Sequence, residues 1–131
     1  MNNKKPLILI IDDDQNFIEI FSAKLAHAGC AIEYAIGGEQ GIKRARELQP
    51  DLILMDVEMP SVNGVQALSI MKDDPSLKNL KIAFLTSYGE KERTEEWQDE
   101  KVAREVGAID YIRKTDDLNS VVEEVKGILA R

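Results

Sequence analysis

The sequence contains one cysteine and one histidine, so it is short of two residue types that build many metal centres and nucleophilic sites. The single cysteine, Cys30, excludes a disulfide within the chain and a zinc site made of paired cysteines. The single histidine, His27, excludes a two-histidine metal centre and leaves a Ser/His/Asp or Cys/His nucleophile with one candidate base. Carboxylates are therefore the main chemical resource of this chain.

The sequence also lacks a long apolar run and an excess of positive charge. No apolar stretch approaches the roughly 18 residues typical of a membrane-spanning helix, and the start of the chain has no signal-peptide pattern. With 17 basic and 24 acidic residues the formal net charge is −7, which repels a nucleic-acid backbone. We expect a cytoplasmic protein that binds neither a membrane nor nucleic acid directly.

The order of apolar runs predicts the fold. The 131 residues match the size of one domain, and we expect residues 1–131 to form a single one. Short apolar runs predict strands at 7–11, 31–35, 52–55, 82–85 and 109–112. Helical spacing predicts helices that follow Asp14, Gly37 and Asn63, a fourth within 90–106 and a last one across 118–129. This alternation indicates an α/β fold with a doubly wound parallel sheet.

Polar residues follow several of these strands, at the edge where such sheets bind ligands. Asp12 and Asp13 follow the first strand, and Asp56 follows the third. Three carboxylates held close together repel one another, and oxygen ligands of this kind suit Mg²⁺. Thr86 and Lys114 follow the fourth and fifth strands, where they could pair with the oxygens of a phosphoryl group carried by Asp56.

The same acidic run has a simpler explanation. Three aspartates after a strand can start a helix, with Asp14 as its N-cap. A third possibility is a phosphatase that resembles haloacid dehalogenases, because Asp12-Asp13-Asp14 contains an Asp-x-Asp pattern. In that case Asp12 would be the nucleophile and Asp14 the acid and base.

The motifs, taken in order, resemble a known family. They are Ile10-Ile11-Asp12-Asp13-Asp14, Leu52-Ile53-Leu54-Met55-Asp56-Val57-Glu58-Met59-Pro60, Phe84-Leu85-Thr86-Ser87 and Tyr111-Ile112-Arg113-Lys114. The chain resembles the receiver domain of two-component response regulators, of the single-domain, chemotaxis-regulator-like kind, over roughly residues 6–130. The resemblance implies a flavodoxin-like sheet of five strands in the order 2-1-3-4-5, with five helices.

The resemblance also implies roles for residues near the expected pocket. Asp56 corresponds to the phosphoacceptor, Asp13 to the direct metal ligand and Asp12 to a ligand that acts largely through water. The backbone carbonyl of Glu58 would complete the protein's share of a Mg²⁺ site. Lys114 corresponds to the lysine that pairs with the phosphoryl group.

Other positions correspond to the family's switch. Thr86 corresponds to the hydroxyl that moves toward the phosphoryl group, and Tyr111 to the aromatic side chain that then fills the vacated space. The change reaches partners through the surface of helix 4, strand 5 and helix 5. Glu58 and Tyr88 occupy positions that would set the lifetime of the aspartyl phosphate.

The family resemblance implies a signalling switch rather than a conventional enzyme. Its own chemistry would be limited to autophosphorylation and autodephosphorylation. The expected partners are a histidine kinase or phosphotransfer protein and a downstream protein target. We expect no output domain within this chain, and a monomer or a weak dimer that depends on phosphorylation. A receiver-like module that binds partners without phosphorylation remains a further alternative.

Two segments depart from the usual receiver pattern. Thr115 follows Lys114 where the family usually has proline, so the peptide bond between them is expected to be trans. Thr115 or Asp116 would then cap the last helix. The segment 90–105 is highly charged, which is typical of a solvated helix. Alternatively, Trp97 makes this segment a recognition surface.

Overall fold

The computed structural model describes residues 5–86, 107–114 and 117–131. The strands are β1 Leu7–Ile11, β2 Ala31–Ala35, β3 Leu52–Asp56, β4 Ile82–Thr86 and β5 Asp110–Arg113. The described helices are α1 Gln15–His27, α2 Gly38–Leu48, α3 Gly64–Lys72 and α5 Leu118–Leu129. The fourth helix that the sequence predicts within 90–106 lies outside the described residues.

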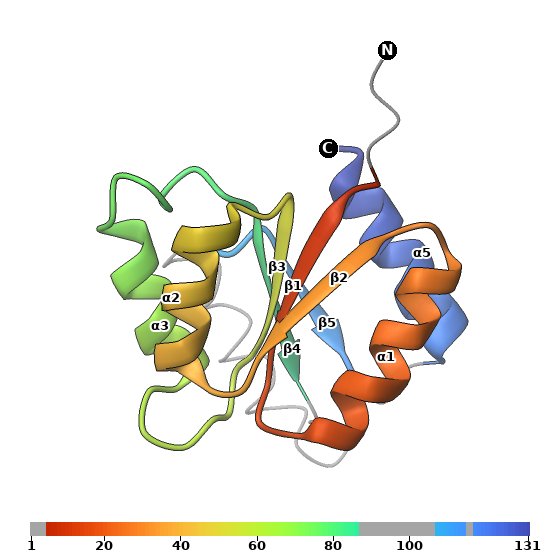
Figure 1. Cartoon of the computed structure of the whole chain (residues 1–131), viewed down its shortest axis with the longest axis horizontal. Coiled ribbons are helices and arrows are strands. Elements are labelled where there is room, and N and C mark those ends of the chain that lie inside the picture. Colours follow the sequence, from red (N-terminus) through yellow and green to blue (C-terminus); the bar gives the residue numbers. More distant parts are fainter. Residues whose placement is uncertain (1–4, 87–106, 115–116) are drawn as a thin grey trace.

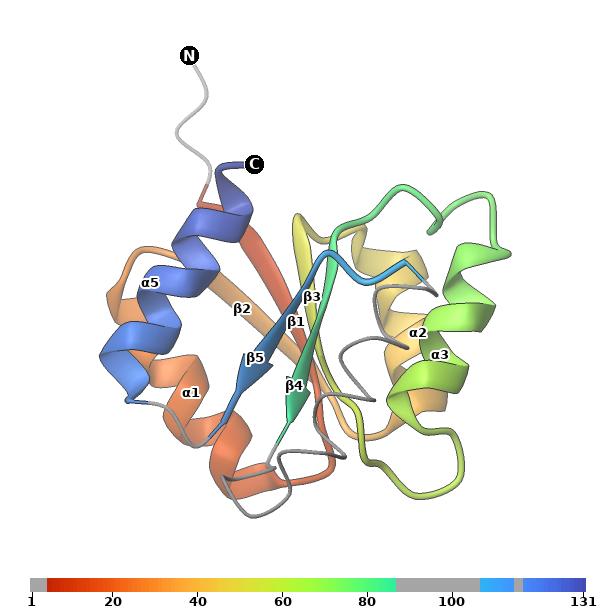
Figure 2. The ribbon, with the colours of Figure 1, turned by 180° about the vertical axis from the view of Figure 1, so that it is seen from behind.

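The five strands form one parallel sheet in the order β2-β1-β3-β4-β5. Figure 1 shows α1 and α5 on one face of this sheet and α2 and α3 on the other. The view from behind in Figure 2 shows the same two layers, with the C-terminal end of α5 at the edge where the strands begin. The predicted flavodoxin-like fold and its strand order are therefore confirmed.

Each central strand is buried on both faces because its side chains alternate between two cores. Ile8 and Ile10 of β1 pack in the core under α1 and α5, whereas Leu9 and Ile11 pack in the core under α2 and α3. Strands with both faces covered need nearly continuous apolar sequence, which explains the run that forms β1. The polar side chains that serve a site are left to the strand ends.

The single cysteine and the single histidine both lie in positions that a structural role explains. Cys30 is 5% exposed in the core under α1 and α5, and burial raises the pKa of its thiol. His27 is exposed in the last turn of α1, and basic residues at this end of a helix interact favourably with the helix dipole. Among the described residues, no helix combines the length and apolarity needed to cross a membrane.

Gly64, the first residue of α3, packs against the backbone at the end of β3. A Cβ at this position would lie 2.4 Å from the backbone oxygen of Asp56 and 2.8 Å from the Cα of Val57. The Gly64 amide also donates a hydrogen bond of 2.9 Å to the carbonyl of Val57. Only a residue without a side chain allows α3 to start against the strand that ends in Asp56.

We expect Gly64→Ala to lower the free energy of unfolding by about 2–3 kcal/mol, because backbone must move to accept the methyl group. Denaturant unfolding measures the change. Gly127→Ala in α5 is the matched control, since a Cβ there meets nothing within 4 Å. The control should gain about 0.5–1 kcal/mol from helix propensity. Equal stability of the Gly64 variant and wild type would contradict the close approach.

Candidate functional site

The carboxyl ends of β1, β3, β4 and β5 meet at the edge of the sheet opposite the end of α5 (Figures 1 and 2). Asp12 follows β1, Asp56 is the last residue of β3, Thr86 is the last residue of β4 and Lys114 follows β5. The backbone amide of Lys114 donates a 2.7 Å hydrogen bond to the carbonyl of Thr86. The sheet therefore brings together residues that the sequence separates by up to 102 positions, from 12 to 114.

Three carboxylates form a compact acidic cluster at this edge. Asp12, Asp13 and Asp56 each present an oxygen within 4.8 Å of the others. Asp12 is fully buried and Asp56 is 4% exposed, whereas Asp13 is exposed. The cluster is therefore open to solvent on the side of Asp13 and enclosed by protein around the other two carboxylates.

Lys114 lies against the two buried carboxylates. Its Nζ is 2.6 Å from Oδ2 of Asp12 and 3.4 Å from Oδ2 of Asp56. The Lys114 side chain is 12% exposed, so these ion pairs are shielded from water. One ammonium group thus offsets part of the charge of two carboxylates.

Backbone amides fix the directions of the two buried carboxylates. Oδ1 of Asp12 accepts a 3.0 Å hydrogen bond from the amide of Asp14. Oδ1 of Asp56 accepts a 3.1 Å hydrogen bond from the amide of Glu58. In each residue the other oxygen, Oδ2, is the one nearest Lys114. The carboxylates are oriented by the loops that follow their strands.

The surroundings of Asp56 oppose its negative charge. Burial, followed by the neighbouring carboxylate of Asp12, raises the pKa of Asp56 to about 7, although Lys114 acts in the opposite direction. Burial alone would lower the pKa of Lys114, but its hydrogen bond to Asp12 and the charges of Asp56 and Asp12 raise it overall. The site thus holds a fixed ammonium beside a carboxylate that a further cation would stabilise.

This pKa predicts a pH dependence of stability in buffer free of divalent cations. Because folded Asp56 binds its proton more tightly than the unfolded chain does, its contribution falls as pH rises from about 4 to about 7. We expect the free energy of unfolding to fall by on the order of 2–4 kcal/mol more in wild type than in Asp56→Asn across this window.

The comparison of the two proteins isolates Asp56 from other carboxylates. Hydrogen bonds from Arg46 and Ser76 lower the pKa of Asp74 to about 2. The contribution of Asp74 to stability is therefore lost as pH falls below about 4, and this loss is the same in wild type and in Asp56→Asn. Urea unfolding at several pH values provides the measurement. If the free energy of unfolding changed with pH in parallel in the two proteins, the pKa of Asp56 would not be raised in the folded state.

Thr86 and Tyr111 lie on adjoining strands near the cluster. Thr86 is 1% exposed at the end of β4, and it is paired in register with Arg113 of β5. Tyr111 is partly buried and packs against the core under α2 and α3. The sheet places Tyr111 opposite Phe84, two residues before Thr86. The two residues to which the family resemblance gives a switch role therefore lie on one strand pair, two register positions apart.

Asp14 acts as the N-cap of α1, as the simpler explanation of the acidic run predicted. Its Oδ1 accepts a 3.1 Å hydrogen bond from the amide of Phe17. Asp14 therefore serves the helix while Asp12 and Asp13 join the cluster, so the run has two functions. The exposed Asp14 carboxylate is not part of the metal-ligand cluster found among the described residues.

The predicted cap of the last helix is wrong. Asp117, rather than Thr115 or Asp116, caps α5, because its Oδ2 accepts a 3.2 Å hydrogen bond from the amide of Ser120. The helix starts later than the sequence prediction placed its cap. Tyr88, the charged segment 90–105 with Trp97, and the bond between Lys114 and Thr115 lie outside the described residues.

Sequence reasoning missed one aromatic residue at the site. Phe17 of α1 places its ring 4.5 Å from Nζ of Lys114, measured to the ring centroid. In the sequence, Phe17 is part of the apolar stripe of α1, and nothing in that stripe indicates a contact with β5. Phe17 lies in the first turn of α1, which begins at Gln15, shortly after β1 ends at Ile11.

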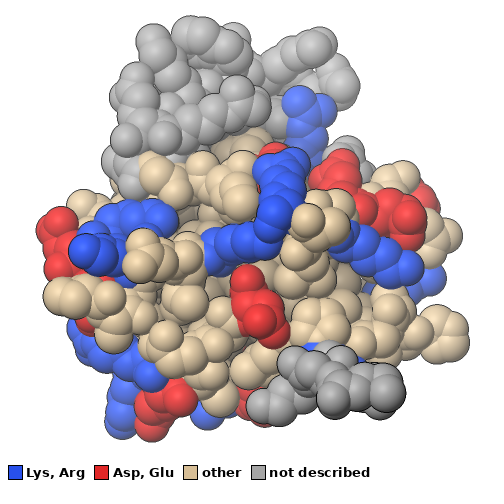
Figure 3. Space-filling model, turned by 90° about the horizontal axis from the view of Figure 1, so that it is seen from above, with Lys and Arg blue, Asp and Glu red and all other residues tan. Residues whose placement is uncertain are grey.

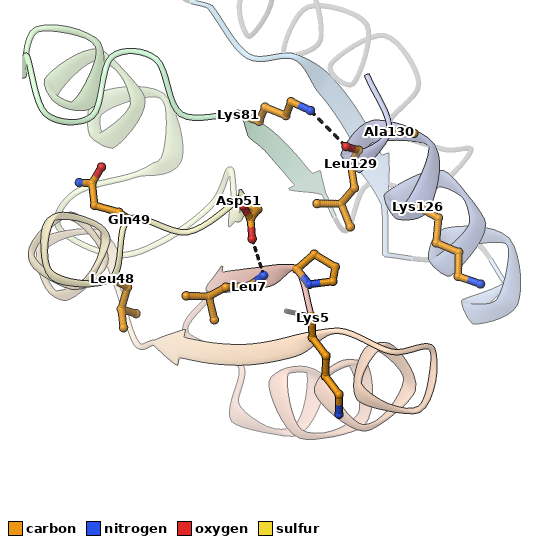
Figure 4. Close-up of a pocket in the computed structure, with 10 residues that line it drawn as sticks. Lys5, Leu7, Leu48, Gln49, Asp51, Lys81, Lys126, Leu129 and Ala130 are labelled. Atoms are coloured by element: carbon orange, nitrogen blue, oxygen red, sulfur yellow. Dashed lines mark hydrogen bonds between the residues drawn. The ribbon is translucent and has the colours of Figure 1, made fainter. Parts of the chain in front are cut away.

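A hollow of about 790 Å³ lies at the opposite edge of the sheet (Figure 4). Several of its polar groups have partners within the chain. Oδ2 of Asp51 accepts a 2.7 Å hydrogen bond from the amide of Leu7, and Lys81 donates to the last carbonyls of α5 and to that of Arg131 at 2.6 Å. Figure 3 shows this face with basic side chains interspersed among acidic ones. We assign no function to it.

The strand order defines a flavodoxin-like α/β domain, and the acidic cluster lies at the carboxyl ends of its strands, where sheets of this kind bind ligands. Residues 8–126 match the family described as the response regulator receiver domain. The chain belongs to this family of two-component signalling domains.

Individual relatives agree with the family assignment. The chain is 32% identical to the DNA-binding dual master transcriptional regulator RpaA of Synechocystis over 126 residues, which are 96% of this chain and 50% of RpaA. It thus spans about half the length of that relative. It is 28% identical to the polar-differentiation response regulator DivK of Brucella anthropi over 93% of this chain and 94% of DivK.

Solved structures agree with the fold. A putative response regulator from Chloroflexus aurantiacus is 30% identical, with a TM-score of 0.86 over 98% of this chain and 100% of that one. The chemotaxis regulator CheY4 of Vibrio cholerae shares the fold at 22% identity, with a TM-score of 0.81 over 95% of this chain and 99% of that one.

Proposed function

We propose that this domain is a phosphoacceptor switch that takes a phosphoryl group onto Asp56. The observation that carries the proposal is the position of Asp56 beside Asp12 and Lys114 at the ligand-binding edge of the sheet. An anionic group bound to Asp56 there would lie near a cation that is already fixed in place. Membership of the receiver family supports the same role.

In the proposed reaction, an oxygen of the Asp56 carboxylate attacks the phosphorus atom of a phosphohistidine on the partner protein. The P–N bond breaks, and the imidazole that leaves takes up a proton, so the phosphoryl group passes to Asp56 as an acyl phosphate. Lys114 would pair with one phosphoryl oxygen and the hydroxyl of Thr86 would donate to another. Slow attack by water on the acyl phosphate would return the domain to its resting state.

The acidic cluster fits a divalent cation such as Mg²⁺. Its donors are carboxylate oxygens within 4.8 Å of one another, and two of the carboxylates are buried. We propose that Asp13 and Asp56 bind the ion directly, that Asp12 acts through water and that the carbonyl of Glu58 completes the protein ligands. When bound, Mg²⁺ would neutralise charge on the phosphoryl oxygens. The chain's own part is to orient the carboxylates of Asp12 and Asp56, which accept hydrogen bonds from the amides of Asp14 and Glu58.

We also propose the family's scheme for output and lifetime. Phosphorylation would draw Thr86 toward the phosphoryl group and allow Tyr111 to reorient, which changes the surface of β5, α5 and the expected fourth helix. Glu58, which is exposed beside Asp56, and Tyr88 would set the decay rate. Decay rates of the phosphorylated protein in variants of these two residues would test this part.

The proposed partners are a histidine kinase or phosphotransfer protein and a downstream protein target. The net charge of −7 supports output through protein rather than through direct contact with nucleic acid. We propose that the domain works in the cytoplasm. Its oligomeric state would be a monomer or a weak dimer that forms on phosphorylation, which light scattering before and after phosphorylation would test.

Incubation with Mg²⁺ and acetyl phosphate, followed by intact mass measurement, tests the proposed function. We expect an increase equal to one phosphoryl group, which is lost when the divalent cation is chelated before the donor is added. Repeated hydrolysis of simple phosphomonoesters without Asp56 would instead support the phosphatase alternative. No adduct with any donor, including a phosphorylated histidine kinase, would support a receiver-like module that is not phosphorylated.

A further inference from the structure

The ammonium group of Lys114 has a third neighbour besides its two carboxylates. The ring of Phe17 lies 4.5 Å from Nζ, a distance at which the negative face of an aromatic ring attracts a cation. The ion pairs to Asp12 and Asp56 are 2.6 Å and 3.4 Å long. Lys114 is therefore held by charge on one side and by an aromatic surface on another.

The Phe17 side chain is partly buried and contacts a second aromatic ring. The centroid of the Phe17 ring lies 5.1 Å from that of Phe21, with an angle of 41° between the rings, and Phe21 is fully buried. The amide of Phe17 is held by the N-cap residue Asp14 at 3.1 Å. A ring anchored through both its backbone and a buried neighbour has little freedom to move away from Lys114.

A lysine side chain has four rotatable carbons and a compact charge, so its ammonium is easily misplaced. In this site the shorter ion pair, to Asp12, favours a position away from Asp56. Phe17 limits the alternatives without competing for the hydrogen bonds of the ammonium. It also contributes to the shielding that leaves the Lys114 side chain 12% exposed.

We propose that Phe17 is a positioning residue for phosphoryl transfer, because its ring holds the ammonium of Lys114 beside Asp56. The proposal rests on the proposed function, since it assumes that Lys114 pairs with the incoming phosphoryl group. Phe17 does not touch the reacting atoms. Its effect passes through Lys114 and depends on the charge-attracting face of the ring rather than on its volume.

The experiment compares the second-order rate constants of phosphorylation by acetyl phosphate in Mg²⁺. Phe17→Leu keeps an apolar side chain but removes the ring, and we expect a fall of about 3–10-fold. Phe17→Tyr keeps the ring and should stay within about twofold of wild type. Ile20→Leu, at a residue of α1 that is 57% exposed, is the matched control and should match wild type.

Two further measurements separate positioning from packing. In a Lys114→Met background, Phe17→Leu should cause no additional loss, because the ring then has no ammonium to hold. In proton NMR spectra of unphosphorylated protein, the ε-methylene protons of Lys114 should be shifted upfield by the ring in wild type and in Phe17→Tyr. This shift should disappear in Phe17→Leu, whose fold is checked by circular dichroism.

The outcomes distinguish the two levels of the proposal. A wild-type protein that forms no adduct would overturn the proposed function, and the role of Phe17 with it. A wild-type protein that is phosphorylated, with Phe17→Leu at the wild-type rate, would overturn the role of Phe17 alone. An equal loss with and without Lys114 would show that Phe17 acts through packing, which also overturns it.

Discussion

Asp56→Asn is expected to abolish the phosphoryl adduct that wild type forms with acetyl phosphate and Mg²⁺. An amide oxygen is a poor nucleophile, and the substitution also removes one of the three carboxylates of the acidic cluster. The side chain keeps its size, and its oxygen can still accept the hydrogen bond from the amide of Glu58. Intact mass measurement should therefore show no adduct in a folded protein.

Asp14→Asn is the matched control for this result. Asp14 lies in the same acidic run, but its carboxylate caps α1, and asparagine caps helices about as well as aspartate. We expect Asp14→Asn to be phosphorylated like wild type. An adduct that persists in Asp56→Asn and disappears in Asp12→Asn would contradict our assignment and favour the phosphatase chemistry of an Asp-x-Asp pattern, in which Asp12 is the nucleophile.

Lys114→Met is expected to lower the free energy of unfolding by about 2–4 kcal/mol at pH 8 without divalent cations. Methionine keeps an unbranched apolar side chain but leaves the buried carboxylates of Asp12 and Asp56 without their shared cation. Urea unfolding measures the loss. Addition of Mg²⁺ should stabilise this variant more than wild type, because the acidic cluster then has no other cation.

Two comparisons show whether the loss comes from these charges. Asp56→Asn added to Lys114→Met should recover part of the stability, because one of the unbalanced carboxylates is gone. Lys126→Met in α5 removes a half-exposed lysine that is 3.5 Å from Glu123, and it should change stability by less than about 0.5 kcal/mol. Equal losses at both lysines would contradict a special role for the Lys114 ion pairs.

Much of the site could be predicted because a parallel sheet collects the carboxyl ends of its strands at one edge. Asp12, Asp56, Thr86 and Lys114 each stand at or just after the end of an apolar run, and the structure brings them to that edge. The cap of α1 was also predictable, because the bond from Asp14 to the amide of Phe17 spans three residues. A helix cap of this kind depends only on residues close together in the sequence, so the sequence can predict it.

Other features could not be predicted from the pattern. The predicted cap of α5, Thr115 or Asp116, was wrong: the helix is capped by Asp117, whose Oδ2 accepts a hydrogen bond from the amide of Ser120. The close contact of Gly64 with the end of β3 depends on how α3 meets the strand. The deciding distances of that contact are set by packing between elements.

The sequence by itself determined the parallel sheet, because apolar runs alternate with helices, and it determined which residues stand at the strand ends. The tertiary structure decided which of these residues touch. It placed the ammonium of Lys114 between two buried carboxylates and set the Phe17 ring against it, although 97 positions separate 17 from 114. Side-chain contacts between distant elements depend on packing angles and distances, and no spacing along a single chain specifies those.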